Sequence, residues 1–130
     1  MRIETQFSVF LINKPGVLAS VTGALSDAGV NLSGLALMDS GEHGALRLVC
    51  DNAPKAREVL AETHDRWTET EVLVMELTDE PGAFARIAAS LADNGINITY
   101  AYCTGGASSS QNLAVFKIPE AEKAMELLGA

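Results

Sequence analysis

One pattern of strand, turn and helix occurs twice in this chain, and it constrains the fold more than any other feature. The first copy runs from Phe7 to Asn31 and the second from Leu73 to Asn97. Each copy has an apolar run, a Pro-Gly turn, a stretch with apolar residues at helical spacing, and a closing Gly-apolar-Asn. Corresponding landmarks are 66 positions apart: Pro15 and Pro81, Gly29 and Gly95, and Asn31 and Asn97. One structural unit is therefore encoded twice.

Each copy predicts a strand, a helix, a hairpin and a second helix. Aromatic and β-branched residues at 6–12 predict a strand, and apolar residues three and four apart predict a helix at 17–28. Gly29 stands where a left-handed cap ends such a helix. The same reasoning predicts strands at 31–39, 44–51, 97–103 and 113–118, a helix at 83–94, and helices after Pro54 and after Pro119.

A single extended stretch, Trp67 to Thr78, joins the two copies. We interpret it as the last strand of the first copy running into the first strand of the second. No linker of Gly, Ser or Pro separates the repeats, so we expect 1–70 and 71–130 to be closely packed domains. The chain stops soon after its last helix, so the second repeat lacks a final strand. That position in the sheet is expected to be vacant or to be filled by a partner chain.

A β-α-β-β-α-β unit is the ferredoxin-like arrangement, in which an antiparallel sheet carries both helices on one face. The predicted fold class is therefore α+β, with two ferredoxin-like βαββαβ repeats. We expect their antiparallel sheets to merge side by side with the helices on one face.

Charge and hydropathy exclude several classes of partner. The 130 residues include 17 acids and 9 Lys or Arg, a formal charge of −8, and the bases are scattered. A nucleic-acid partner and an anionic membrane are therefore not expected. No stretch approaches the roughly 18 apolar residues of a membrane span, and the start lacks the apolar core of a signal peptide, so a cytoplasmic protein is expected. Cys50 and Cys103 lack any CxxC spacing and are expected to be reduced and buried.

The sequence offers no set of residues for catalysis. We find no nucleophile with a placed base, no metal-ligand cluster and no cofactor loop, so catalytic residues, metal and cofactor are all predicted to be absent. Gly105-Gly106 is not a phosphate loop, because no Lys-Ser or Lys-Thr follows it. A small isomerase or mutase remains an alternative class, and its sign would be a buried Arg47 or Glu76 between the repeats.

The repeated motif resembles the ACT domain. The resemblance rests on Asn-Lys-Pro-Gly-Val-Leu and Asp-Glu-Pro-Gly-Ala-Phe after a strand, and on Ala-Gly-Val-Asn-Leu and Asn-Gly-Ile-Asn-Ile at the helix ends. It covers both halves of the chain. ACT domains are small ferredoxin-like modules that bind amino acids and regulate metabolic enzymes, usually as paired modules. The resemblance implies a small amino acid ligand, a homodimer and a metabolic enzyme as partners.

The resemblance also implies a ligand site at the turn between strand and helix, near the interface between two modules. Glycine in that turn lets a ligand approach the backbone, and the free N–H groups at a helix start favour a carboxylate. An amide at Asn13 suits a zwitterion, whereas Asp79 would favour its ammonium group. The expected ligand-binding residues are Asn13, Lys14, Pro15, Gly16, Val17, Leu18, Asn31 and Leu32, with Asp79, Glu80, Pro81, Gly82, Ala83, Phe84, Asn97 and Ile98 in the second copy.

Three questions stay open at the level of sequence. Leu11 and Leu77 stand where serine-sensing members carry histidine, so serine is not favoured as the ligand. The alternative to a ligand site is that the Pro-Gly pairs only form the turns and that Asn13 or Asp79 only satisfies helix-end N–H groups. The alternative function is a protein-protein regulatory subunit of a metabolic enzyme in which the ligand site is degenerate.

Overall fold

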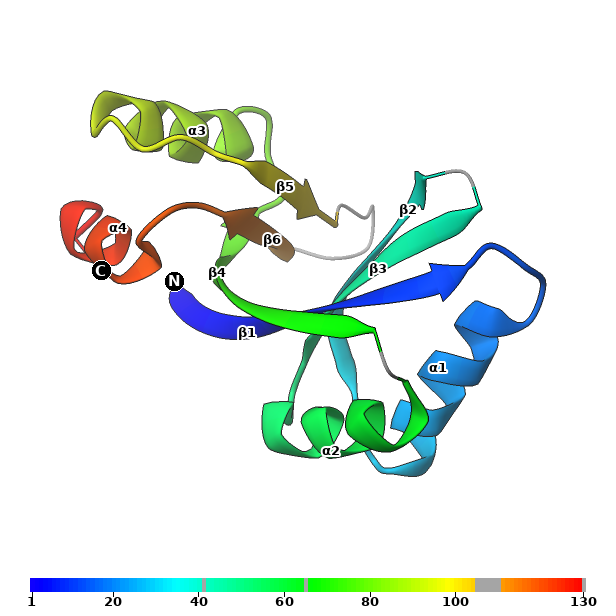
Figure 1. Ribbon diagram of the computed structural model, residues 1–130. Helices are drawn as coiled ribbons and strands as arrows, with labels where there is room; N and C mark the ends of the chain where they lie inside the picture. Colours follow the sequence, from blue (N-terminus) through cyan, green and yellow to red (C-terminus); the bar gives the residue numbers. More distant parts are fainter. Residues whose placement is uncertain (41, 65, 105–110, 130) are drawn as a thin grey trace. The chain divides into compact units, whose positions relative to one another are not determined.

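The computed structural model describes residues 1–40, 42–64, 66–104 and 111–129. These residues form six strands and four helices in the order β1-α1-β2-β3-α2-β4-α3-β5-β6-α4 (Figure 1). The chain divides into two compact units, which we call the first unit, residues 5–70, and the second unit, residues 1–4 with 71–130. The mixed α and antiparallel β architecture confirms the predicted fold class.

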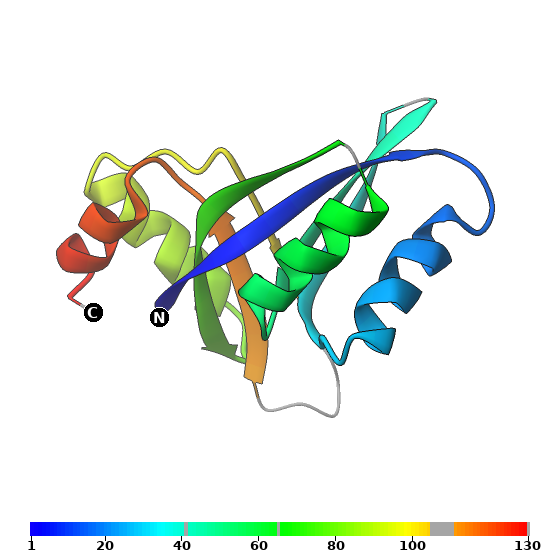
Figure 2. The same ribbon diagram turned by 60° about the horizontal axis from the view of Figure 1, so that its bottom comes forward.

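The first unit contains most of β1 (Arg2–Ile12), then α1 (Val17–Asp27), β2 (Leu32–Ser40), β3 (His43–Cys50), α2 (Ala53–Thr63) and the start of β4 (Trp67–Thr78). Its hydrogen-bonded strand order is β2-β3-β1-β4, with antiparallel pairs. Both helices lie on the same side of these strands (Figure 2). This is the ferredoxin-like order, so the first copy folds as its pattern predicts.

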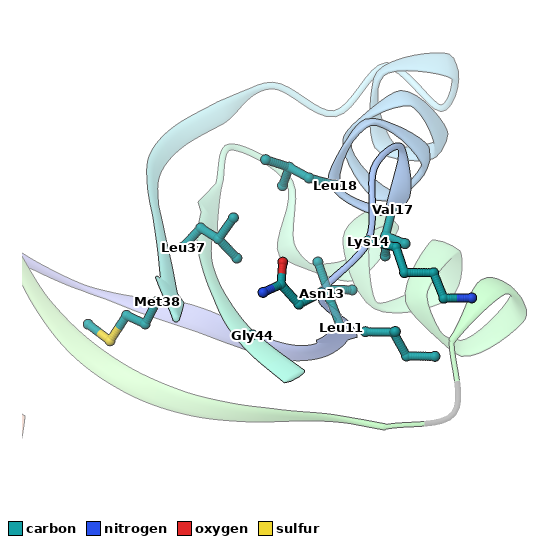
Figure 3. A pocket seen from close by; sticks show the side chains of 9 residues that line it. Leu11, Asn13, Lys14, Val17, Leu18, Leu37, Met38 and Gly44 are labelled. Carbon is teal, nitrogen blue, oxygen red and sulfur yellow. The ribbon is translucent and has the colours of Figure 1, made fainter. Parts of the chain in front are cut away.

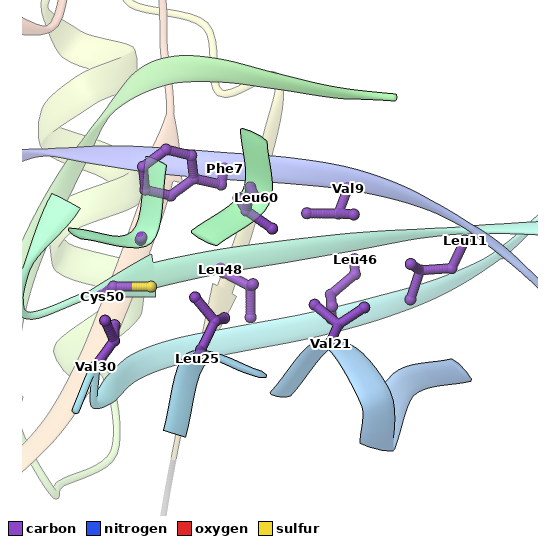
Figure 4. Close-up of a cluster of buried hydrophobic side chains, with 11 residues drawn as sticks. Phe7, Val9, Leu11, Val21, Leu25, Val30, Leu46, Leu48, Cys50 and Leu60 are labelled. Atoms are coloured by element: carbon purple, nitrogen blue, oxygen red, sulfur yellow. The ribbon is translucent and has the colours of Figure 1, made fainter. Parts of the chain in front are cut away.

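Buried and more exposed side chains alternate along β1 and β3, and the buried ones form the core of the first unit. Phe7 and Val9 in β1 lie opposite Leu48 and Leu46 in β3, and all four side chains are fully buried. The core is completed by residues from α1, α2 and the neighbouring segments (Figure 4), namely Leu11, Val21, Leu25, Val30, Cys50, Ala56 and Leu60. Because strand residues two apart share a face, the other face of β1 carries Phe10 and Ile12, which remain 46% and 51% exposed.

The second unit contains the rest of β4, then α3 (Ala83–Asp93), β5 (Tyr100–Cys103), β6 (Gln111–Lys117) and α4 (Ala121–Leu127). Its antiparallel strand order is β1-β4-β6-β5. A separate core joins β4 and β6 to α3 and α4 through buried Leu73, Met75, Leu77, Ala83, Leu91, Ala114, Phe116, Ile118, Ala121 and Ala124. Both helices therefore pack on one face of this unit as well.

The start of β1 fills the position expected to be vacant or taken by a partner chain. Residues 1–4 belong to the second unit, where Ile3 packs against its core and Arg2 Nη1 lies 3.7 Å from Glu76 Oε1. No strand follows α4 among the described residues, as the sequence predicts. β1 and β4, of 11 and 12 residues, each have one end in each unit. Because these two strands are shared, six strands supply the four positions of each unit's strand order.

Several local expectations need correction. The helix expected at 17–28 ends at Asp27, and its N-cap is Gly16. The strand expected at 97–103 begins only at Tyr100. Cys50 is buried as expected, but Cys103 is exposed because it ends the short edge strand β5. The connection expected to join the last two strands falls mostly at 105–110, outside the described residues.

Candidate functional site

The turn between β1 and α1 leaves the start of a helix without a side-chain cap. Gly16 has φ 87°, a left-handed conformation that side chains with a Cβ rarely adopt, and it makes no side-chain capping hydrogen bond. The Val17 N–H reaches the Lys14 carbonyl only at 3.4 Å. The first N–H groups of a helix have no intrahelical acceptor, so this turn presents donors suited to an anionic group.

A cavity of about 300 Å³ lies beside this turn. Its lining combines the end of β1, the turn, the first residues of α1, and parts of β2 and β3 (Figure 3): Leu11, Ile12, Asn13, Lys14, Val17, Leu18, Leu37, Met38 and Gly44. Aliphatic side chains and methionine make up most of it. In the figure the Asn13 amide faces the space between Leu37 and α1, whereas the Lys14 side chain extends away from Leu37. We call this space the first cavity.

Gly44 keeps part of the first cavity open. It lies opposite Leu11 in the β1–β3 register and next to Asp39 in β2. A Cβ built on Gly44 would lie 3.2 Å from the Met38 carbonyl oxygen and 3.3 Å from Leu37 Cδ1. A side chain at this position would therefore have to displace the edge strand or enter the cavity.

The structure brings together part of the residue set expected in the first copy. Asn13, Lys14, Val17 and Leu18 line the first cavity, while Pro15 and Gly16 shape its turn. Asn31 and Leu32 instead line a different and more open cavity, shared with α1 residues Ala19, Thr22, Gly23 and Ser26 and with Val30. The Asn31 N–H donates to Asp51 Oδ1 at 2.9 Å.

Five lining residues were not among the expected ones: Leu11, Ile12, Leu37, Met38 and Gly44. Leu11 and Ile12 directly precede the turn, so their position in the sequence could have indicated them. The other three come from β2 and β3, and only strand pairing brings them to the turn.

In the second copy, the polar residues of the turn are engaged by other residues of their own unit. Asn112 Nδ2 donates to Asp79 Oδ1 at 3.2 Å, and Arg86 Nη2 donates to Glu80 Oε1 at 2.6 Å. Gly82 again has a left-handed φ of 89°, and a Cβ there would lie 3.3 Å from Arg86 Nη1.

Aromatic stacking occupies the next positions of the second copy. Phe84, the counterpart of Leu18, stacks on Phe116 with ring centroids 5.2 Å apart and planes inclined by 22°. Ala83 is buried beneath it in the core. Asn97 is exposed, and Ile98 packs against the core of the second unit. The two turns are thus alike in backbone and different in side-chain environment.

The described part of the chain contains no group of three or more His, Cys, Asp or Glu residues that could hold a metal ion. Among its helices, none is long and apolar enough to cross a membrane.

Comparison with known proteins supports the repeat interpretation. A family model described as an ACT domain pair matches residues 1–129. Protein BT0572 from Bacteroides thetaiotaomicron superposes with a TM-score of 0.87 at 29% identity, covering 97% of this chain and 86% of that one. No curated protein matches this sequence.

Two regulatory subunits of aspartate kinase share the fold at lower identity. The ligand-free subunit from Thermus thermophilus gives a TM-score of 0.70 at 20% identity and covers 98% of this chain and 93% of that one. The subunit from Thermus flavus gives 0.61 at 22% identity with the same coverages. The match over nearly the whole chain, together with the two ferredoxin-like units, establishes that this protein belongs to the ACT domain family, as an ACT domain pair.

Proposed function

We propose that this ACT domain pair is a non-catalytic regulatory module that binds a small amino acid in the first cavity. The observation that carries the proposal is the first cavity itself, which lies beside the uncapped start of α1 and contains the Asn13 amide. Helix-start N–H groups bind a carboxylate, and an amide offers both a donor and an acceptor to a zwitterion.

The lining also favours a class of side chain. Leu11, Val17, Leu18, Leu37 and Met38 supply an apolar surface, and none of the lining side chains that the structure describes is a carboxylate. A basic side chain would lose its hydration against this apolar surface. We therefore propose an amino acid with an uncharged, largely aliphatic side chain.

Binding in the first repeat and not in the second is part of the proposal. In the second repeat Asp79 already accepts a hydrogen bond from Asn112, Glu80 is paired with Arg86, and Phe84 is stacked on Phe116. A ligand at that turn would have to displace these contacts. The proposed partners of the module are a second copy of the chain and a metabolic enzyme. The enzyme partner is proposed because two proteins that share the fold are regulatory subunits of aspartate kinase.

A thermal-shift scan against the standard amino acids tests this function. A ligand at one hundred times its dissociation constant adds about 2.7 kcal/mol of stability, which raises Tm by several degrees in a protein of this size. Leucine, isoleucine, valine or methionine should stabilise the protein, and aspartate and lysine should not. Asn13→Ala should abolish the shift, whereas Asp79→Ala should retain it.

A protein-protein regulatory subunit with a degenerate ligand site is the second candidate. Exposed apolar side chains on β1 and β2 favour it, since Phe10, Ile12, Leu35, Leu37 and Met38 are each 38% to 51% exposed. A folded protein whose Tm responds to no amino acid would support this candidate and contradict the first.

A further inference from the structure

A second cavity, of about 310 Å³, adjoins the first one on the side of α2 and the start of β4. The two cavities share Leu11, Ile12, Lys14 and Val17. The residues that only the second cavity has are Phe10, His43, His64 and Arg66. Its volume is at the lower end of the range for small-molecule sites.

The charge of this lining is opposite to that of the protein. Four basic residues line the second cavity, in a chain with a formal charge of −8, and none of the described lining residues is an acid. Asp65 lies between His64 and Arg66 in the sequence but outside the described residues. Gathering these bases in one hollow produces a local positive potential that attracts anions.

Lys14 and Arg66 differ from the other Lys and Arg side chains. Among the side chains that the structure describes, these two make no ion pair with an acid, whereas each of the other seven has a partner. Ion pairs join Arg2 to Glu4 and Glu76, Lys55 to Glu58, Arg57 to Glu69, Arg86 to Glu80 and Lys123 to Glu120. Arg47 and Lys117 also make interactions. The two unpaired cations both line the second cavity.

Hydrogen bonds hold the Arg66 backbone and the His64 imidazole in place. The Arg66 carbonyl accepts a hydrogen bond from the Phe10 N–H at 3.0 Å, which ties the start of β4 to β1. Thr63 Oγ1 lies 2.8 Å from His64 Nδ1, so the imidazole is held at the end of α2. The Lys14 side chain extends away from Leu37 in the first cavity (Figure 3). Its charge is therefore available to the second cavity.

The remaining lining is apolar and accessible. Phe10 and Ile12 lie two residues apart on one face of β1 and are 46% and 51% exposed, with Leu11 and Val17 beside them. An aromatic face next to cationic side chains suits a ligand that joins a planar or aliphatic group to an anionic head.

We propose that the second cavity binds a small organic anion, a carboxylate or phosphate group attached to an apolar body. Lys14, His64 and Arg66 bind the anionic head, and Phe10 with Ile12 contacts the apolar part. This site adjoins the amino-acid site of the proposed function and shares Leu11, Ile12, Lys14 and Val17 with it, whereas Phe10, His43, His64 and Arg66 belong to the second cavity alone.

Amide NMR titration with simple probes tests the chemical class. Phenylacetate and phenyl phosphate should shift the signals of Phe10 and Arg66 in a saturable way, and the tighter of the two identifies the preferred head group. Acetate, inorganic phosphate and benzyl alcohol should bind at least about tenfold more weakly, since each lacks one half of the ligand. Benzyl alcohol binding as tightly as phenylacetate would overturn the role of the cations. Inorganic phosphate binding as tightly as phenyl phosphate would overturn the apolar contact.

Charge-neutralising variants test the named residues. Lys14→Gln combined with Arg66→Gln should weaken phenyl-anion binding at least tenfold, with an otherwise unchanged amide spectrum as the check on folding. Lys55→Gln removes one positive charge from α2, outside the cavity lining, and should leave the affinity unchanged. Equal affinity in the double variant would refute the site. An acidic peptide that binds at Arg66 more tightly than either phenyl anion would replace the small ligand with a protein partner.

Discussion

Asn112 donates a hydrogen bond from Nδ2 to Asp79 Oδ1 over 3.2 Å, across two strands of the second unit. Asn112 lies opposite Leu77 in the β4–β6 register, as Gly44 lies opposite Leu11 in the β1–β3 register. The first repeat therefore has a glycine where the second repeat has a side chain that binds the acid of its turn. Gly44 therefore leaves space beside the first turn, whereas Asn112 binds the carboxylate of the second turn.

Gly44→Ala should close part of the first cavity. The new Cβ would lie 3.2 Å from the Met38 carbonyl oxygen and 3.3 Å from Leu37 Cδ1, so β2 must shift or the cavity must shrink. We expect a loss of about 1–2 kcal/mol in the free energy of unfolding, as for other overpacked sites. Amino acid affinity, measured by calorimetry, should fall at least about tenfold.

Gly23→Ala is the matched control for that substitution. A Cβ on Gly23 meets nothing within 4 Å, and the residue lies inside α1. Alanine in a helix interior should raise stability by about 0.5–1 kcal/mol. If Gly44→Ala keeps full affinity for the ligand, the first cavity is not the binding site.

Leu37→Ala should weaken ligand binding and leave the stability of the fold almost unchanged. Leu37 is 49% exposed and lines the first cavity, so its truncation removes ligand contacts and little buried core. Chemical denaturation should show a change within about 0.5 kcal/mol, while amino acid affinity decreases. Leu35→Ala, on the same strand with 42% exposure but outside the lining, should change neither quantity. Similar losses of affinity in both variants would point to β2 in general and not to the cavity.

Ile3→Ala should destabilise the second unit although Ile3 is near the chain start. Ile3 is partly buried against the second core, beside β4. We expect a loss of about 1–2 kcal/mol, less than for a fully buried side chain. Hydrogen exchange should accelerate in β4 and β6 more than in β3. Ile12→Ala, at 51% exposure, should have almost no effect on stability, and a uniform effect of Ile3→Ala on all strands would contradict the proposed location of the damage.

Glu69→Gln should reduce stability in a way that depends on pH. Arg57 donates two hydrogen bonds to the Glu69 carboxylate, at 2.8 and 2.7 Å, and holds the pKa of that carboxyl below its ordinary value. A lowered pKa in the folded state stabilises the protein above the unfolded pKa, about 4.3 for glutamate, and the gain disappears as pH falls through the folded pKa.

The Tm difference between wild type and Glu69→Gln should thus be small and constant from pH 7 to about 5, and should shrink to zero at lower pH. It is small because both side chains are well exposed, at 45% and 31%, and solvent screens the pair. A Tm difference that persists at pH 2 would show that the substitution acts through packing and not through charge.

Most elements of the fold were predictable from local patterns. The spacing of Leu18, Val21 and Leu25 predicts a helix at 17–28, and α1 spans Val17–Asp27. The extended stretch Trp67 to Thr78 is β4 with the same bounds. Gly29, expected as a left-handed cap, has φ 79°. These features depend on residues close in the chain, where side-chain period and glycine conformation decide the outcome.

The candidate site was predictable only in part. Asn13, Lys14, Val17 and Leu18 were found because the repeated motif marks the turn, and all four line the first cavity. Asn31 belongs to the same repeated motif, but it lies at the opposite end of α1, in a separate cavity. An 11-residue helix is about 16 Å long, so adjacency within a sequence motif did not imply adjacency in space.

The sequence by itself determined the duplication, the order of helices and strands, and the left-handed glycine turns, because each of these follows from short-range periodicity and backbone conformation. Only the tertiary structure decided that residues 1–4 complete the second unit, that Gly44 opens one turn while Asn112 binds Asp79 in the other, and that Lys14 and Arg66 meet at one cavity. Those relationships join residues tens of positions apart, and strand register and packing bring them together.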